Sequence, residues 1–540
     1  MTVKRKNAEN EKTKKESINW ENVNISPEII NLVPYEAAKK YRFVPLEKDG
    51  QTLRVGVVEM DDIEVQNALQ FLAEKNQISV EMIKVSESEF KSALSAYTSP
   101  TFTISKALET ISRAETSEEK GKTGEESESE EADKIIREAP VAKIVEVILR
   151  NAIEGAASDI HVEPLEDLVR VRYRQDGVLH NSLMLPKKIG PAIVSRVKIL
   201  SNLKIDERRK PQDGRFRIIE KGKQIDFRVS SLPVSMGEKV VMRVLDKEQG
   251  LIGLEDLGIQ GRNLEIIKKS IFEPFGMILV TGPTGSGKST TLYSILQILN
   301  KEGVNIVTLE DPVEYAIEGV NQSQVKPEIG YTFANGLRSI LRQDPDVIMV
   351  GEIRDKETAE LGVHAALTGH VVLTTLHTND SIGAIPRLVD MGVEPFLVAS
   401  SVRVVVAQRL VRRICKHCKE EDKMPESAKK DIEKALSLIS DEHKKQLELP
   451  SEIKMYKGKG CPQCGGSGMK GRVALFEVFY MDERVANLLS EKIDEDDLRK
   501  AAAEQGMVLM KQDGVVKVIK GITTLSEVER VTEEGYLEIE

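Results

Sequence analysis

A short glycine-rich stretch in the middle of the chain constrains the fold more than any other feature. Residues 282–289 read Gly-Pro-Thr-Gly-Ser-Gly-Lys-Ser, a complete G-x-x-x-x-G-K-[ST] pattern, directly after an apolar run at 277–281. Glycines at this spacing let the backbone turn and point N–H groups at phosphate oxygens. The stretch predicts a strand, a phosphate-binding loop and a helix over 289–300, and therefore a nucleoside triphosphate as ligand.

Each residue type in the loop fits phosphate chemistry. Lys288 would reach the β- and γ-phosphates, and Ser289 would ligate Mg²⁺. A glycine turn beside an unrelated lysine is the alternative, but it does not explain the flanking strand and helix patterns. The predicted nucleotide-binding residues are Gly282, Pro283, Thr284, Gly285, Ser286, Gly287, Lys288, Ser289 and Thr290.

The chain is long enough for about three or four domains. A lysine-rich disordered tail at 1–22 precedes an expected N-terminal α/β domain at 23–98. An acidic linker is expected at 99–135, because this segment is rich in glutamate and serine and cannot bury enough apolar surface to order. The second α/β domain, the core with the phosphate loop, a cysteine module and a helical region are expected at 136–248, 249–408, 409–480 and 481–540.

Short β-rich runs alternate with helical stretches around the phosphate loop, which predicts a parallel sheet with helices on both faces. These runs are 277–281, 304–309, 347–350 and 371–376. In the second domain, Asp-Gly pairs at 176–177 and 213–214 lie between strand-like runs, and both predict hairpin turns.

Polar residues follow three of the predicted strands. Glu310, Asp311 and Glu314 follow the run at 304–309, Glu352 follows the next, and His377 follows the third. Because ligands of parallel sheets bind at the carboxyl ends of the strands, all of them are expected beside the phosphate loop. Hydrolysis of a phosphoanhydride needs a group that orients water and charge near the γ-phosphate, which this set would supply.

Bulk properties narrow the class of protein. The net charge is −10 and aromatic residues make up 4% of the chain, which argues against the main alternative, a nucleic-acid motor with the same loop. A regulatory nucleotide-binding protein without turnover is a second alternative. No run of about 18 apolar residues is present, and the charged N-terminus does not resemble a signal peptide. A cytoplasmic protein that meets membranes through partners is expected.

All four cysteines lie in two Cys-x-x-Cys pairs, Cys415 with Cys418 and Cys461 with Cys464. In a reducing compartment such pairs more often bind metal than form disulfides, and together they supply the four ligands of a structural Zn²⁺. His417 is a competing ligand. Buried or redox-active cysteines are the remaining alternative.

Together these motifs resemble the secretion traffic ATPases that drive type IV pilus assembly and type II secretion, over most of the chain. The motifs that carry the resemblance, besides the phosphate loop and the cysteine pairs, are Ser158-Asp-Ile-His161, Arg172-Tyr-Arg-Gln-Asp-Gly, Pro211-Gln-Asp-Gly-Arg215, Glu310 to Glu314, Gly351-Glu-Ile-Arg-Asp355, Ala366-Leu-Thr-Gly-His370 and Thr375-Leu-His-Thr-Asn379. The resemblance implies a P-loop, RecA-like ATPase core, a PAS-like α/β second domain, a small α/β N-terminal domain and a zinc-binding insert.

The resemblance also implies site roles. Glu314 matches the water-orienting glutamate, Glu352 acts through Mg²⁺ or the water network, and His377 matches a residue thought to sense the γ-phosphate. The second domain supplies arginines, for which Arg215 and Arg228 are the predicted positions and Arg243 a weaker one. Cations that arrive from a separate domain couple hydrolysis to domain movement.

The cysteine pairs and the N-terminal domain favour an extension or secretion motor, because retraction motors of pili lack both. The resemblance implies a homo-hexamer that acts on an inner-membrane platform protein, with the N-terminal domain on a membrane-associated assembly partner. Some such domains bind a cyclic dinucleotide through an Arg-Leu-Gly motif, which is absent before residue 60, so this ligand is not predicted. Ser158, Asp159 and His161 could be read as a catalytic triad, but neighbouring positions do not face one another, and domain packing is the preferred role.

Overall fold

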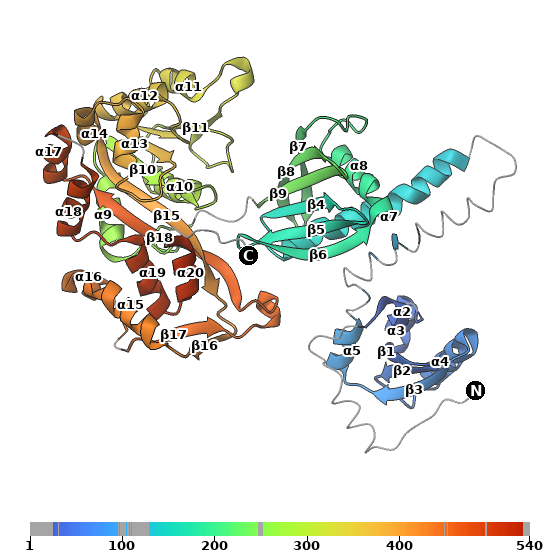
Figure 1. Ribbon diagram of the computed structural model, residues 1–540. Coiled ribbons are helices and arrows are strands. Elements are labelled where there is room, and N and C mark those ends of the chain that lie inside the picture. The colour runs from blue at the N-terminus through green and yellow to red at the C-terminus, as the bar shows by residue number, and fades with distance from the viewer. Residues whose placement is uncertain are drawn as a thin grey trace. The chain divides into compact units, whose positions relative to one another are not determined.

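The computed structural model describes residues 25–30, 32–94, 97, 104, 107–108, 110, 129–246, 252–447, 449–450, 452–491 and 494–532. The predicted basic tail at 1–22 and most of the predicted linker at 99–135 lie outside these residues. The chain divides into two compact units, Met1–Asp246 and Lys247–Glu540 (Figure 1).

The N-terminal domain is built on a three-stranded sheet in the order β1-β2-β3. β1 is antiparallel to β2, whereas β2 and β3 are parallel and are joined by the crossover helix α4. Apolar residues of β2 and α4, including Leu53, Val55 and Leu69, are buried together. The elements are α2 (Pro27–Ile30), α3 (Tyr35–Tyr41), β1 (Phe43–Asp49), β2 (Thr52–Val57), α4 (Ile63–Asn76), β3 (Ser79–Lys84) and α5 (Glu87–Leu94).

The second domain is a six-stranded antiparallel sheet in the order β6-β5-β4-β9-β8-β7. Alternate residues of its strands pack with helices α7 and α8 in one core, which leaves the other face of the sheet polar. Helix α7 begins inside the segment expected to be linker. The elements are α7 (Ser129–Glu154), β4 (Asp159–Pro164), β5 (Leu168–Gln175), β6 (Val178–Pro186), η2 (Lys187–Ile189), α8 (Gly190–Leu200), β7 (Gln212–Glu220), β8 (Lys223–Val234) and β9 (Gly237–Asp246).

One of the two predicted Asp-Gly turns is confirmed and the other is wrong. Asp176 and Gly177 form the left-handed turn between β5 and β6, with φ of 48° and 88°. Gly214, however, lies inside β7 opposite Val229. Glycine is needed there for space, because a Cβ would lie 2.7 Å from the carbonyl oxygen of Ser201. The hairpin turn instead falls at residues 221–222.

The second unit is built on a seven-stranded sheet in the order β12-β11-β13-β14-β10-β15-β18. All neighbours are parallel except β18, which is antiparallel to β15. The four predicted strand runs correspond to β10, β11, β13 and β14. The strands are β10 (Gly276–Thr281), β11 (Ile306–Glu310), β12 (Asn321–Gln324), β13 (Val347–Val350), β14 (Val371–Leu376), β15 (Val402–Ile414) and β18 (Met469–Tyr480).

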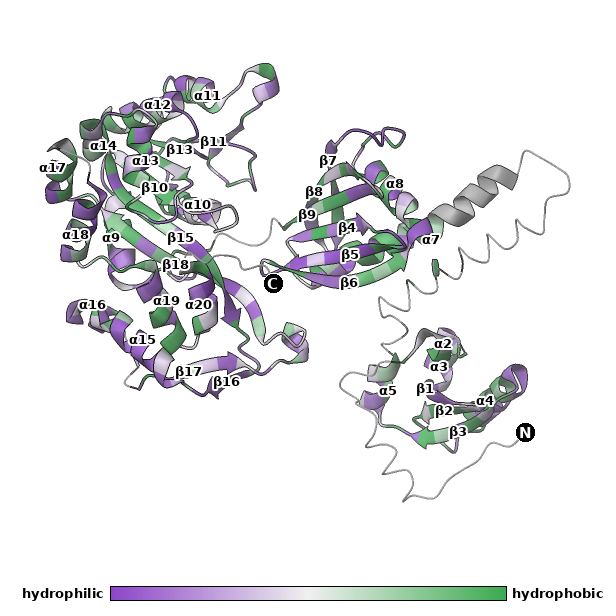
Figure 2. Ribbon diagram, viewed as in Figure 1, coloured by the Kyte–Doolittle hydropathy of each residue, from purple (hydrophilic) through white to green (hydrophobic). Residues whose placement is uncertain are grey.

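Helices cover both faces of this sheet, as strand–helix alternation predicts. One apolar core contains α9 and α10, and another contains α11 to α14 on the opposite face. Every residue of β10, β13 and β14 is buried, and Figure 2 shows hydrophobic residues along the central strands and hydrophilic ones on outer helices such as α18. The helices are α9 (Gly261–Ile271), α10 (Lys288–Leu299), η3 (Pro327–Ile329), α11 (Phe333–Ile340), α12 (Lys356–Leu367), α13 (Ala384–Asp390) and α14 (Pro395–Ser401).

The cysteine-containing segment is an insertion between two neighbouring core strands. β15 continues through the expected boundary at residue 408 to Ile414, and β18 brings the chain back into the same sheet from Met469. The insertion holds β16 (Lys419–Asp422), α15 (Glu426–Ser437), α16 (Asp441–Gln446), β17 (Met455–Gly458) and η4 (Pro462–Cys464), and the helices α17 (Glu483–Glu491), α18 (Glu495–Glu504), α19 (Met510–Ile519) and α20 (Leu525–Thr532) follow β18.

The close approach at Gly214 gives a test of the second domain. We expect Gly214→Ala to lower the unfolding free energy by about 1–3 kcal/mol, because the added methyl has no room without a backbone shift. The measurement is thermal unfolding of the full chain. Gly253→Ala is the control, since the nearest atom to its Cβ is at an ordinary 3.4 Å. Equal melting temperatures for the two variants would contradict the packing described here.

Candidate active site and metal centre

The phosphate loop leaves the end of β10 and enters α10. Gly282 and Gly287 have φ of 147° and 91°, values that favour glycine, and both approach Gln408 of β15. A Cβ on Gly282 would lie 2.5 Å from the carbonyl oxygen of Gln408, and one on Gly287 would lie 2.8 Å from its side-chain nitrogen. The loop therefore rests directly on β15, and only glycine fits at either end.

Lys288 is folded onto the loop that it would use to hold phosphate. Its Nζ donates to the carbonyl oxygens of Gly282 and Pro283 at 2.8 and 3.1 Å. Burial lowers the pKa of this ammonium, Glu352 opposes the shift, and Arg409 adds to it. A bound phosphate would favour the charged ammonium and so oppose the effects of burial and of Arg409 on the pKa of Lys288.

The loop also fits a nucleotide with Mg²⁺. The buried Ser286 hydroxyl has no hydrogen-bond partner among the described residues, as expected where a ligand supplies one. Ser289 is exposed in the first turn of α10, where its hydroxyl is free to reach a cation beside the phosphates. The residues of the phosphate loop therefore fit a nucleoside triphosphate with Mg²⁺, the ligand that the sequence predicts.

The structure brings Glu352 and His377 together at the carboxyl ends of β13 and β14. His377 Nε2 lies 3.5 Å from one carboxylate oxygen of Glu352, and Arg354 Nη2 lies 2.7 Å from the other. The side chain of Glu352 is only 12% exposed, and its two carboxylate oxygens face Arg354 and His377. Its electrostatic effect on Lys288 places this carboxylate in the field of the phosphate loop.

Several residues of the segment that follows β14 are hydrogen-bonded to other strands of the sheet. The Thr378 hydroxyl pairs with that of Thr281 at 2.7 Å, and Asn379 Oδ1 accepts from Arg409 Nη2 at 3.0 Å. Ser381 donates to the buried carboxylate of Glu477. The segment that begins with His377 is thus hydrogen-bonded to β10, β15 and β18.

The three acids expected after β11 divide into two environments. Glu310 is 4% exposed and turned into the protein, where it accepts hydrogen bonds from Tyr293 and Thr308. Asp311 is exposed, and Glu314 is half-buried. The expectation that all three face the phosphate loop is therefore wrong for Glu310, whose neighbours on β12 and α10 bury it.

The predicted arginines lie in one row on the open face of the second domain. Arg215 on β7 lies opposite Arg228 on β8, and Arg228 lies opposite Arg243 on β9. Arg243 in turn lies opposite Asp159 on β4. Asp159 Oδ1 accepts from Arg243 Nε at 3.1 Å, so this carboxylate neutralises the Arg243 end of the row. Like charges directly opposite one another on neighbouring strands cost stability.

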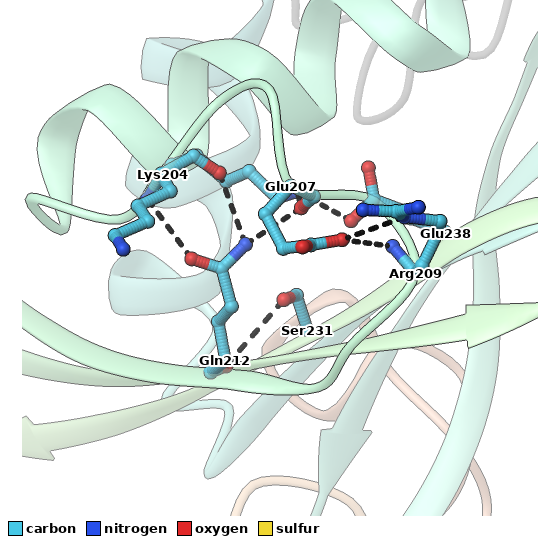
Figure 3. Close-up of polar contacts among 7 residues, drawn as sticks. Lys204, Glu207, Arg209, Gln212, Ser231 and Glu238 are labelled. Atoms are coloured by element: carbon cyan, nitrogen blue, oxygen red, sulfur yellow. Dashed lines mark hydrogen bonds and ion pairs between the residues drawn. The ribbon is translucent and has the colours of Figure 1, made fainter.

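A polar network holds the turn that leads into this row (Figure 3). The Gln212 side chain accepts from the Lys204 backbone N–H at 2.9 Å and donates to the carbonyls of Lys204 and Glu207. The buried ammonium of Lys198 donates to the Glu207 carbonyl and pairs with Glu238. Gln212, the second residue of the motif that ends in Arg215, therefore fixes the preceding loop.

The motif from Ser158 to His161, in the same domain, makes contacts that stabilise the fold. The Ser158 hydroxyl donates to Asp159 Oδ2 at 2.9 Å rather than to a histidine. His161 lies 3.8 Å from Glu163, which also pairs with Arg170 and Arg172. Burial opposes ionisation of Glu163, but its hydrogen-bond donors lower its pKa to about 2.

The four cysteines converge as predicted. The sulfur atoms of Cys415, Cys418, Cys461 and Cys464 lie within 4.8 Å of one another. The Cys415–Cys461 and Cys418–Cys464 pairs are each separated by 3.8 Å. A tetrahedron with Zn–S bonds of about 2.3 Å has sulfur edges of about 3.8 Å, so the donor set fits Zn²⁺. His417 is exposed and lies outside this group.

Backbone donors support the thiolate form that a metal needs. Cys464 Sγ accepts from the N–H groups of Cys461 and Gly468 at 3.2 and 3.3 Å. Burial opposes ionisation, but these donors and the neighbouring sulfurs lower the pKa of Cys464, whereas burial raises the pKa of Cys418 in the same cluster. Glycine at position 458 allows the chain to approach this closely, because a Cβ there would lie only 1.9 Å from the Gly468 carbonyl oxygen.

The parallel sheet, the phosphate loop and the polar strand ends define a P-loop nucleoside triphosphatase. Residues 134–530 match the family described as type II/IV secretion system protein, and residues 16–103 match the MshEN domain. The chain belongs to the type II/IV secretion system protein family and is an ATPase, which confirms the resemblance.

Two curated relatives define its place in the family. The type IV pilus assembly ATPase PilB of Myxococcus xanthus is 44% identical over 95% of this chain and 88% of its own length. The type II secretion system ATPase E of Vibrio cholerae is 46% identical over 74% of this chain and 76% of its own. The solved ATPase DotB of Legionella pneumophila shares the fold, with a TM-score of 0.52 and 23% identity over 72% of this chain and 95% of that chain.

These relatives are secretion and pilus ATPases, so they favour that class over the nucleic-acid motor considered as the alternative. No helix in the described part of the chain is both long and apolar enough to cross a bilayer.

The sulfur tetrahedron predicts that purified protein contains about one Zn²⁺ per chain. Replacing both Cys461 and Cys464 with serine should remove it, as measured by elemental analysis, because two of four ligands are lost. His417→Ala is the matched control and should keep the full zinc content. Zinc-free folded protein, or loss of zinc from the His417 variant, would show that the ligand set is wrong.

Proposed function

We propose that this protein is a hexameric ATP-driven motor that powers pilin polymerisation in type IV pilus assembly. The observation that carries the catalytic part is the meeting of Lys288, Glu352 and His377 at one edge of the sheet. The pilus ATPase of M. xanthus aligns over 95% of the chain, whereas the type II secretion ATPase aligns over 74%. Pseudopilus assembly in type II secretion is therefore the second candidate.

In the proposed cycle the phosphate loop holds the triphosphate and Lys288 reaches the β- and γ-phosphates. Ser289 would hold Mg²⁺, which when bound neutralises charge on the phosphates. Glu314 orients the attacking water, and Glu352 supports that network from its fixed position. His377, whose loop is hydrogen-bonded to β10, β15 and β18, registers whether a γ-phosphate is present.

Arg215 and Arg228 complete the site from the second domain. A row of guanidinium groups on an open sheet face is suited to the charge that spreads over the γ-phosphate oxygens in the transition state. Because these cations belong to a different unit from the phosphate loop, ATP binding would draw the two units together and hydrolysis would release them. That movement is the proposed mechanical output.

The proposed partners follow from the family. The motor would act in the cytoplasm as a homo-hexamer against an inner-membrane platform protein, with the N-terminal domain docking on a membrane-associated assembly partner. The nucleotide would lie between the catalytic domain and mobile second-domain surfaces. The zinc centre would brace the insertion and so support assembly or platform coupling rather than phosphate chemistry.

Glu314→Gln tests the proposed catalytic role. We expect the variant to release phosphate from ATP at least ~100-fold more slowly, because an amide cannot accept a proton from the attacking water. Lys288→Ala should also be inactive through lost phosphate contact. Glu318→Gln, an exposed acid four residues further on, is the control. Unchanged turnover in the Glu314 variant would rule out this assignment, and DNA-stimulated turnover would favour a nucleic-acid motor.

The arginine row gives a second test of the same function. Arg215→Ala and Arg228→Ala should each reduce kcat by at least ~100-fold, since cations that stabilise the transferred phosphoryl group contribute factors of this size or more. Arg217→Ala is the control, because Arg217 lies two residues after Arg215 on β7 and its side chain is paired with Asp226 on β8. If all three variants hydrolyse ATP equally well, the second domain does not supply these cations.

A further inference from the structure

A tyrosine in the phosphate-loop helix connects the two sides of the nucleotide site. Tyr293 lies in the second turn of α10, five residues after Lys288, and its side chain is 1% exposed. The hydroxyl donates to Glu310 Oε2 at the end of β11. The Tyr293 hydroxyl oxygen also accepts from the backbone N–H of Glu314 at 3.3 Å and lies 3.5 Å from Gln322 Nε2.

The carboxylate of Glu310 is held by neutral donors. Thr308 Oγ1 donates to it at 2.6 Å and Gln322 Nε2 at 3.1 Å, in addition to Tyr293. No cation pairs with Glu310 among the residues that the structure describes. A buried carboxylate costs free energy unless its hydrogen bonds are complete, so each of these donors is needed.

Packing alone does not require the Tyr293 hydroxyl. The ring lies in an apolar core and meets the ring of Tyr315 edge-on, with centroids 4.6 Å apart. Phenylalanine would fill the same space without burying a polar atom. Burial, with Glu310 nearby, raises the pKa of Tyr293, so the hydroxyl keeps its proton and remains a donor across the physiological range.

We propose that Tyr293 is a positioning residue for hydrolysis. Its hydroxyl ties the helix that carries Lys288 to residues 310–314, and thereby sets where Glu314 lies relative to the phosphates. This inference rests on the proposed role of Glu314. Binding of the triphosphate at the start of α10 would thus be transmitted to the acid that orients water through the Tyr293 side chain.

Gln322 makes the connection three-sided. It lies on β12, and its side-chain oxygen accepts from the Ile317 N–H at 2.7 Å while its nitrogen donates to the Tyr315 carbonyl at 3.1 Å. The segment after β11 is therefore held at residue 314 by Tyr293 and at residues 315 and 317 by Gln322. Loss of the hydroxyl would free only the first of these points, which is the one closest to Glu314.

Tyr293→Phe tests the proposal in the full-length assembled protein with MgATP. We expect kcat to fall ~10–100-fold, the effect typical of removing a group that orients a catalytic ligand. The KM for ATP and the affinity for ADP should change less than about threefold, because the phosphate loop is intact. Tyr315→Phe is the matched control and should retain wild-type kcat, since its ring makes the same contact but its hydroxyl bonds neither acid.

The double variant Tyr293→Phe/Glu310→Gln shows whether activity is lost through poor positioning or through a buried carboxylate that has lost a hydrogen-bond donor. It also tests the proposal if the single variant does not fold. We expect its melting temperature to return toward wild type while kcat remains low. Wild-type kcat in either variant would overturn the proposal. If Glu314→Gln is inactive in that case, only the role of Tyr293 fails. If Glu314→Gln is itself fully active, the proposed catalytic assignment fails first.

Discussion

The parallel pairing of β10 with β14 on one side and β15 on the other determines where every group of the nucleotide site lies. Thr281 is in register with Leu376 and with Ala407, so β10 and β14 end level with Ala407 of β15, which continues through Gln408 to Ile414. The phosphate loop, the His377 segment and Gln408 consequently meet at one edge. The strands hold this register because they are buried on both faces and packed by helices from each side.

From that edge, hydrogen bonds lead to the rest of the catalytic unit. The loop after β14 reaches α18 through the Asp380–Arg499 ion pair and reaches α19 through Glu477, which accepts from the Met510 N–H. On the other side, Tyr293 links α10 to the acids after β11. The phosphate loop is thus connected by polar contacts both to the acids that follow β11 and to the helices that follow β18.

The sequence was sufficient for features that short-range patterns encode. The phosphate loop, the strands leading to Glu352 and His377, and the cysteine tetrad all follow from spacing and composition. Other features depend on contacts between distant residues. Gly214 looks like a turn residue until the carbonyl of Ser201 is seen beside it, and Glu310 looks like one of three acids around the phosphates until Tyr293 and β12 are seen to bury it. The return of β18 to the core sheet leaves no local signal either.

The central claim is that the arginine row closes on the phosphate loop when ATP binds. It is tested most directly by distance measurements between spin labels at Ser230, on the arginine face of β8, and Glu318, on the catalytic unit, in the full-length assembly. Labels on unnatural amino acids leave the cysteines to the metal. We expect a shorter, narrower distance distribution with a non-hydrolysable ATP analogue than with ADP. Identical distributions in both nucleotide states would contradict it.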